Sequence, residues 1–218
     1  MPAPAFAKMD RSFPMSSDLT NDLAALKATL CRKSVRLGDF TLASGEKSSI
    51  YVDSKLTTFS PEAMPLVGRL FIQKLLDCGW HPDAVGGLTL GADPIAFAIA
   101  RESLDTVHPI NAFVVRKDAK SHGMGKVIAG LENVRDLSVV IIDDVCTKGG
   151  STAQAIESAR AAGMRILGAI CLVDRRQGAT ELLRDRYGVP LESIFTLSQL
   201  TDHMKALDAA SHPVGSGV

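Results

Sequence analysis

One segment in the second half of the chain combines acids, hydroxyls and glycines in an order that suits a phosphorylated sugar. Four consecutive β-branched residues predict a buried strand that ends at two adjacent acids, Asp143 and Asp144. Carboxylates accept hydrogen bonds from vicinal hydroxyls or hold a cation. A glycine turn with the hydroxyls of Thr147, Ser151 and Thr152 then leads into a predicted helix, whose unpaired N–H groups bind anions. The segment therefore predicts a site for a ligand with both hydroxyl groups and a phosphate.

Two other classes of nucleotide site lack the motifs that they need. An NTPase requires G-x-x-x-x-G-K-[ST], whereas Gly86 and Gly91 have that spacing but are followed by Ala92 and Asp93. No G-x-G-x-x-G occurs, so a dinucleotide-binding fold has no support. An ordinary strand-to-helix turn of an open α/β sheet remains the alternative at this point.

A second segment, Arg116 to Lys126, is rich in positive charge. It holds four cations and a histidine, shows no apolar periodicity, and follows a predicted strand. This composition predicts a long mobile loop over about 117–127. Such a loop can close over a multiply charged anion and exclude water, although a merely solvated loop is the alternative.

Composition limits the possible partners. The 218 residues include 24 Lys plus Arg and 24 Asp plus Glu, so no overall field attracts nucleic acid or an anionic membrane. The four cysteines form no C-x-x-C pair, which favours a reducing compartment and argues against a disulfide frame. No apolar run is long enough to span a membrane, and the first residues lack the apolar core of a signal peptide. We therefore expect a cytoplasmic protein without nucleic-acid or membrane partners.

The predicted elements fall into a small N-terminal part and an alternating part. A helix over 18–31 and two short strands over 35–53 precede a helix over 61–79. The predicted strands that follow cover 84–89, 111–116, 138–142, 166–173 and 193–196, and the predicted helices cover 93–101, 153–162, 179–187 and 198–209. Alternation of this kind is typical of an α/β fold with a mostly parallel central sheet flanked by helices. We expect one domain over 18–210, between a disordered segment 1–17 and a loose tail 211–218.

Three motifs together resemble one enzyme family. The acid-glycine segment is similar to the signature with which type I phosphoribosyltransferases bind 5-phosphoribosyl 1-diphosphate (PRPP). Residues 40–53, FTLASGEKSSIYVD, resemble the hood of the orotate phosphoribosyltransferases, and 116–123, RKDAKSHG, resemble their flexible catalytic loop. Asp174 and Arg175 match an Asp-Arg pair of that family. The resemblance extends from about residue 18 to 200, with a hood over about 18–55.

The resemblance implies transfer of the phosphoribosyl group from PRPP to orotate, giving orotidine 5′-monophosphate and pyrophosphate in pyrimidine synthesis. It implies a Mg²⁺ cofactor bound through PRPP, with Asp143 and Asp144 as candidate ligands. The implied PRPP-binding residues are Arg116, Lys117, Lys120, His122, Asp143, Asp144, Val145, Cys146, Thr147, Lys148, Gly149, Gly150 and Ser151. The candidate catalytic residues among them are Lys117, Lys120, His122, Asp143 and Asp144, and the implied orotate-binding residues are Tyr51, Val52, Thr147 and Arg175. Leu90, Gly91 and Ala92 match the family's pyrophosphate loop.

The family also implies a homodimer in which Arg116, Lys120 and His122 reach the neighbouring subunit's site. Some members have a lysine where this chain has Ala43, and many have a small or neutral residue where it has Lys148. Arg176 follows Arg175 directly, so either arginine is a candidate for the orotate carboxylate. A purine phosphoribosyltransferase and a PRPP-binding regulator are the alternatives. A neutral purine needs no carboxylate-binding arginine, and a regulator needs a nucleic-acid surface that the sequence does not show.

Overall fold

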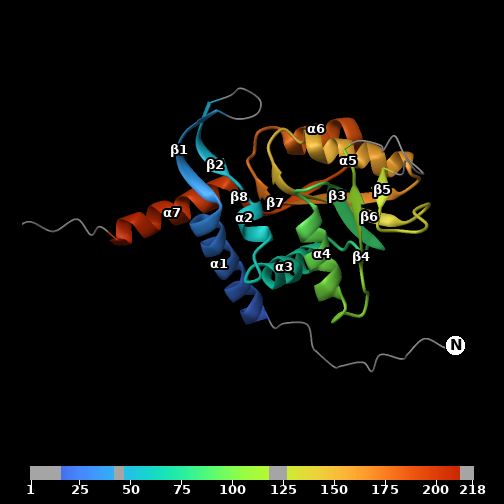
Figure 1. Cartoon of the computed structure of the whole chain (residues 1–218), viewed down its shortest axis with the longest axis horizontal. Coiled ribbons are helices and arrows are strands. Elements are labelled where there is room, and N and C mark those ends of the chain that lie inside the picture. The colour runs from blue at the N-terminus through green and yellow to red at the C-terminus, as the bar shows by residue number, and fades with distance from the viewer. Residues whose placement is uncertain (1–15, 42–46, 118–126, 212–218) are drawn as a thin grey trace, which may run out of the picture.

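The central feature of the computed structural model is a six-stranded sheet covered by helices (Figure 1). The structure describes residues 16–41, 47–117 and 127–211. The strands are β3 (Ala84–Leu88), β4 (Asn111–Val115), β5 (Ile128–Ala129), β6 (Ser138–Cys146), β7 (Arg165–Asp174) and β8 (Leu191–Thr196), in the order β5-β4-β3-β6-β7-β8. All neighbouring strands are parallel except β5, which pairs antiparallel with β4 at the edge. The prediction of a mostly parallel α/β sheet is confirmed.

The strands at the centre of this sheet are apolar because both of their faces are buried. In β6, Val140 and Ile142 pack in one hydrophobic cluster, whereas Val139 and Ile141 pack in the other. Alternate residues of a strand point to opposite faces, so a continuous β-branched run places apolar side chains in both layers.

Helices cover the two faces unequally. α3 (Met64–Asp77) and α4 (Asp93–Ser103) pack on one face, together with α1 (Ser16–Lys33). α5 (Gly150–Ala161) and α6 (Ala179–Tyr187) lie on the other face (Figure 1). None of the helices within the described ranges is long and apolar enough to cross a membrane.

The N-terminal hood is a hairpin carried by α1. β1 (Val35–Thr41) and β2 (Lys47–Val52) pair antiparallel, and the short helix α2 (Lys55–Thr58) follows them. The last helix, α7 (Leu197–Ser211), contacts α1. The hairpin lies near the carboxyl ends of the sheet strands, as Figure 1 shows.

Several element boundaries differ from the predicted ones. The helix predicted over 61–79 begins only at Met64, because residues 60–63 form a turn closed by the Ala63 N–H and the Met64 N–H on the carbonyl of Ser60. α5 begins at Gly150 and not at residue 153. Strand β5 was not predicted, since two residues carry no periodicity. Of the segments expected to be loose, 1–17 and 211–218, residues 16, 17 and 211 belong to α1 and α7, and the remainder lies outside the described residues.

Candidate active site

The candidate site lies where the strand order of the sheet reverses. β3 and β6 are neighbours, but the chain leaves β3 for β4 on one side and leaves β6 for β7 on the other. The loops after these two strands therefore diverge and leave a crevice at the carboxyl end of the sheet, the usual ligand site of open α/β folds. The predicted pyrophosphate loop follows β3, and the acid-glycine turn follows β6.

Asp144 lies at this crevice, between the hood and the loop after β3. Its side chain is 16% exposed, and its Oδ2 accepts a hydrogen bond of 2.5 Å from Ser54 Oγ. Its carboxylate also packs against Gly91: a Cβ at that glycine would lie 2.7 Å from Asp144 Cγ, which is too close for a real contact. The acid thus joins three segments that are distant in sequence.

Asp143 is placed differently from the prediction that both acids follow the strand at the solvent boundary. β6 continues to Cys146, because its pairing with β7 extends to Cys146 opposite Asp174. Asp143 is only 7% exposed and accepts a hydrogen bond of 2.6 Å from Thr152 Oγ1 and one of 2.9 Å from the Asp144 N–H. The expectation that the Thr152 hydroxyl faces a phosphate is wrong in this structure, since it donates to Asp143 inside the protein.

The environment of Asp143 disfavours its ionised form. Burial raises its pKa to about 7, and the neighbouring charge of Asp144 adds to the increase. The hydrogen bonds from Thr152 and from the Asp144 N–H oppose the shift without cancelling it. The two adjacent acids therefore have unlike chemistry, one buried and one at the crevice.

The turn after β6 has the conformation that the glycines predict. Gly149 has φ +79° and leads directly into α5, so its left-handed backbone favours glycine. Thr147 is half-buried, Lys148 and Ser151 are exposed, and Cys146 is buried as a small core residue. The first N–H groups of α5 thereby lie beside the crevice, and Val145 packs against the core.

A backbone hydrogen bond joins the two residues that flank the basic loop. The Arg116 N–H donates to the Val127 carbonyl at 2.9 Å, next to the antiparallel pairing of β4 with β5. Arg116 is half-buried and Lys117 is exposed. Lys120 and His122, like Ala43 in the hood, lie outside the described residues, so their predicted roles stay predictions.

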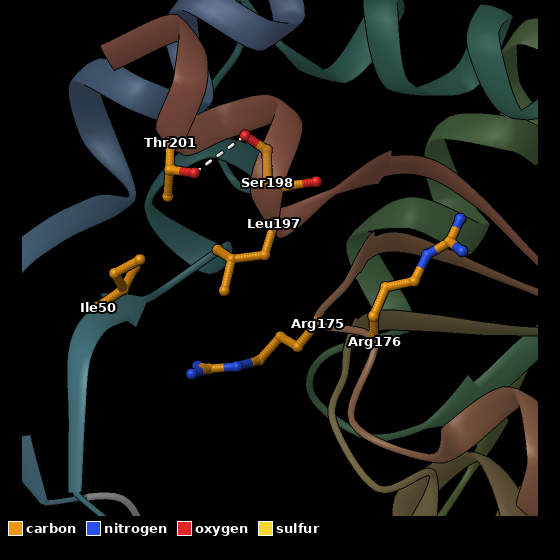
Figure 2. Close-up of a pocket in the computed structure, with 6 residues that line it drawn as sticks. All are labelled: Ile50, Arg175, Arg176, Leu197, Ser198 and Thr201. Carbon is orange, nitrogen blue, oxygen red and sulfur yellow. Dashed lines mark hydrogen bonds between the residues drawn. The ribbon is translucent and has the colours of Figure 1, made fainter. Parts of the chain in front are cut away.

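Arg175 extends from the end of β7 towards the hood. Its Nη2 donates to Ser48 Oγ of β2 at 3.1 Å, and its Nε is buried without a partner. Beside it is a pocket of about 270 Å³, lined by Ile50, Arg175, Arg176, Leu197, Ser198 and Thr201. Figure 2 shows Arg175 running below this pocket towards the hood strand, whereas Arg176 points away. The Arg176 backbone N–H donates to Asp174 Oδ1, and its guanidinium lies 3.6 Å from the same carboxylate.

The two hood residues implied for orotate point to opposite sides of β2. Tyr51 is 44% exposed and lies against Phe40, with ring centroids 5.5 Å apart, whereas Val52 packs towards the core. This alternation follows from the two-residue period of a strand. Neither side chain lines the pocket beside Arg175, and Thr147 does not line it either.

Ser54 and Lys55 are site residues that the sequence did not indicate. Ser54 is fully buried, and Lys55 Nζ lies 3.0 Å from Asp53 Oδ1 and 4.0 Å from Asp144 Oδ2. They directly follow the hood motif, but no pattern in the sequence connects them with an acid 90 residues away. Within the described residues, no group of three or more His, Cys, Asp or Glu side chains could hold a metal ion.

Comparisons with known proteins agree with this geometry. The family model for the phosphoribosyl transferase domain matches residues 59–206. Orotate phosphoribosyltransferase of Aquifex aeolicus is 43% identical over 172 residues, which cover 78% of this chain and 92% of that protein. The Nostoc enzyme of the same name is 36% identical over 195 residues, covering 89% and 93%. The crystal structure of Mycobacterium tuberculosis orotate phosphoribosyltransferase in complex with PRPP has a TM-score of 0.68 and 35% identity, covering 83% of this chain and 99% of that one.

Proposed function

The chain belongs to the orotate phosphoribosyltransferase family, and on that premise we propose which of its residues carry out the reaction. The reaction transfers the 5-phosphoribosyl group of PRPP to orotate and yields orotidine 5′-monophosphate and pyrophosphate, a step of UMP biosynthesis. The observation that supports the assignment best is the contact of Asp144 with Gly91 across the crevice between β3 and β6. It joins the expected ribose-binding and pyrophosphate-binding segments at one point.

We place the ribose of PRPP at Asp144. Each carboxylate oxygen already accepts one hydrogen bond, Oδ1 from the Val145 N–H and Oδ2 from Ser54. Each oxygen retains a lone pair for a ribose hydroxyl. Asp143 is too deeply buried for the same contact, so its role is to hold the end of β6 against α5 through Thr152.

The 5′-phosphate fits the turn from Thr147 to Ser151. The unpaired N–H groups at the start of α5 and the positive end of its dipole favour an anion there. Exposed Lys148 and Ser151 are beside this position. The leaving pyrophosphate would then face the backbone of Leu90, Gly91 and Ala92.

Orotate fits beside Arg175 and not beside Arg176. A guanidinium suits a planar carboxylate, and the buried Arg175 Nε has no partner in the structure. Arg176 is already paired with Asp174 and is 74% exposed. Ile50 and Leu197 supply apolar walls to the pocket next to Arg175.

Charge develops in two places as the bond to the leaving group breaks: positive on the ribose C1 and negative on the pyrophosphate. Asp144 offsets the first. Lys117, Lys120, His122 and Arg116 would offset the second once the loop closes and excludes water. Mg²⁺ fits as an ion that enters with PRPP, because it commonly binds through one or two carboxylates and substrate phosphates. Asp144 is the accessible carboxylate for it.

The function is tested by following orotate consumption with PRPP and Mg²⁺, with EDTA as the control. Adenine replaces orotate in a parallel assay. Loss of orotate, release of pyrophosphate and inhibition by EDTA are the expected results. Turnover of adenine without turnover of orotate would contradict the assignment of Arg175.

We also propose a homodimer in which the loop residues Arg116, Lys120 and His122 complete the partner's site. Large apolar side chains are exposed on α2, directly after it, before α4 and on α4, which is consistent with a surface that another subunit covers. They are Leu56, Phe59, Leu90 and Phe97.

Mixing two inactive variants should restore activity if the sites are shared. In a mixed dimer of Lys120→Ala and Asp144→Asn, one site receives an intact loop and an intact acid. After random exchange, half of the dimers are mixed and one of their two sites is intact, so we expect about a quarter of the wild-type rate. A mixed dimer verified by two affinity tags that stays as inactive as its parents would show that each site is self-contained.

Ser48→Ala should weaken orotate binding alone. The substitution removes the acceptor that orients Arg175, and loss of one such hydrogen bond costs about 0.5–1.5 kcal/mol, or roughly two- to twelve-fold in the KM for orotate. The KM for PRPP should not change. Ser49→Ala, on the opposite and exposed face of β2, is the matched control. If both substitutions raise the KM for orotate equally, Ser48 has no specific role in orotate binding.

A further inference from the structure

We propose that Ser54 is a positioning residue for the reaction: its hydroxyl fixes the carboxylate of Asp144 in the orientation that receives the ribose of PRPP. This inference rests on the proposed function, since it requires Asp144 to contact PRPP. It assigns a catalytic consequence to a residue that lies beyond the three motifs of the sequence.

The contact is buried and specific. Ser54 has no exposed surface, and its Oγ donates to Asp144 Oδ2 at 2.5 Å. The charged acceptor makes this a stronger hydrogen bond than one between neutral groups. A side chain with no solvent access and one strong acceptor has little freedom to turn elsewhere.

Among the groups around Asp144, the Ser54 hydroxyl is the one that sets the orientation of the carboxylate plane. Oδ1 accepts from the Val145 N–H, and the backbone of Gly91 packs on the same side as Oδ1. Lys55 Nζ is 4.0 Å from Oδ2, too far for a hydrogen bond, and it pairs more closely with Asp53. The lysine adds positive charge near Asp144, whereas the serine hydroxyl orients the carboxylate.

The position of Ser54 also connects the two substrate sites. It lies two residues after the end of β2, and that strand carries Ser48, which holds Arg175. The hood strand is thus fastened to the sheet at both ends, at the end of β7 by Ser48 and at the end of β6 by Ser54. Ser54 therefore acts on the PRPP side of the site and Ser48 on the orotate side.

The experiment is a double-mutant cycle on kcat/KM for PRPP with Ser54→Ala and Asp144→Ala. We expect Ser54→Ala to lower kcat/KM roughly 10–100-fold, the usual cost of removing a group that orients a ligating carboxylate. The KM for orotate should stay within about two-fold. In the Asp144→Ala background, Ser54→Ala should have no further effect, because its only route to the reaction has been removed.

Two further variants separate positioning from packing. Ser54→Cys keeps nearly the same volume but is a poor donor, so it should lose activity like Ser54→Ala while melting close to the wild type. Ser60→Ala removes a buried hydroxyl without a partner in the neighbouring turn and should leave kcat/KM unchanged.

The outcomes distinguish this inference from the proposed function. If Asp144→Ala retains full activity, the assignment of the ribose to Asp144 is wrong. If Asp144→Ala is inactive or severely impaired but the effects of the two substitutions on kcat/KM add, Ser54 acts by another route and the inference fails. Wild-type kinetics in Ser54→Cys would likewise overturn it.

Discussion

Gly91→Ala should lower kcat/KM for PRPP by about two orders of magnitude while the protein still folds. The added Cβ would lie 2.7 Å from Asp144 Cγ, so either the acid or the loop after β3 must move. The Asp144 carboxylate cannot turn away without losing a hydrogen bond, because Ser54 and the Val145 N–H hold its two oxygens. Movement of the loop instead displaces the backbone donors that face pyrophosphate. A displacement of about 1 Å at a reacting centre costs about 10²-fold in rate.

This prediction is measured by initial rates at saturating orotate and by thermal melting of the same preparations. A folded variant with a melting temperature near that of the wild type and a strongly reduced kcat/KM is the expected result. Unchanged kcat/KM would mean that the loop and the acid are not held together during the reaction. A loss of activity that follows a loss of folded protein would instead make Gly91 a packing residue.

The sequence predicted the layers of the fold because its strongest patterns are periodic. The β-branched run of β6 and its alternation with helices required a sheet buried on both faces, and the structure has one. The short strand β5 and the start of α3 were not predicted correctly. Their positions depend on pairing with β4 and on a turn at Ser60, contacts that leave no periodic signal.

The sequence also predicted which segments meet at the crevice, but it did not predict how they meet. The acids 143 and 144 are adjacent in sequence, yet a strand places neighbouring side chains on opposite sides. One acid therefore lies inside against Thr152 and the other at the crevice. The contact of Ser54 with Asp144 depends on the path of the hood across the sheet, which is a property of the whole fold.

The buried position of Asp143 leads to a prediction about stability. The pKa of its carboxyl is about 7 in the folded protein, against an ordinary value of 3.8. Between these values the folded state keeps a proton that the unfolded chain has lost, so raising the pH favours unfolding. The contribution of this group to stability is present in full below about pH 4 and is lost as the pH rises through 7.

Asp143→Asn should therefore be more stable than the wild type at pH 8, and its advantage should be smaller at pH 5, where the wild type has lost only part of this contribution. The amide oxygen can accept from the Asp144 N–H while the amide NH2 donates to the Thr152 hydroxyl, and the side chain carries no charge to bury. About three pKa units correspond to about 4 kcal/mol at most, or a difference in melting temperature of roughly 10 °C for a chain of this size. Melting is followed in EDTA at both pH values, with Asp185→Asn, an exposed carboxyl on α6, as the control. Destabilisation by Asp143→Asn that is equal at pH 5 and pH 8 would show that the carboxyl is ionised throughout, and that Thr152 and the Asp144 N–H stabilise its charge against burial.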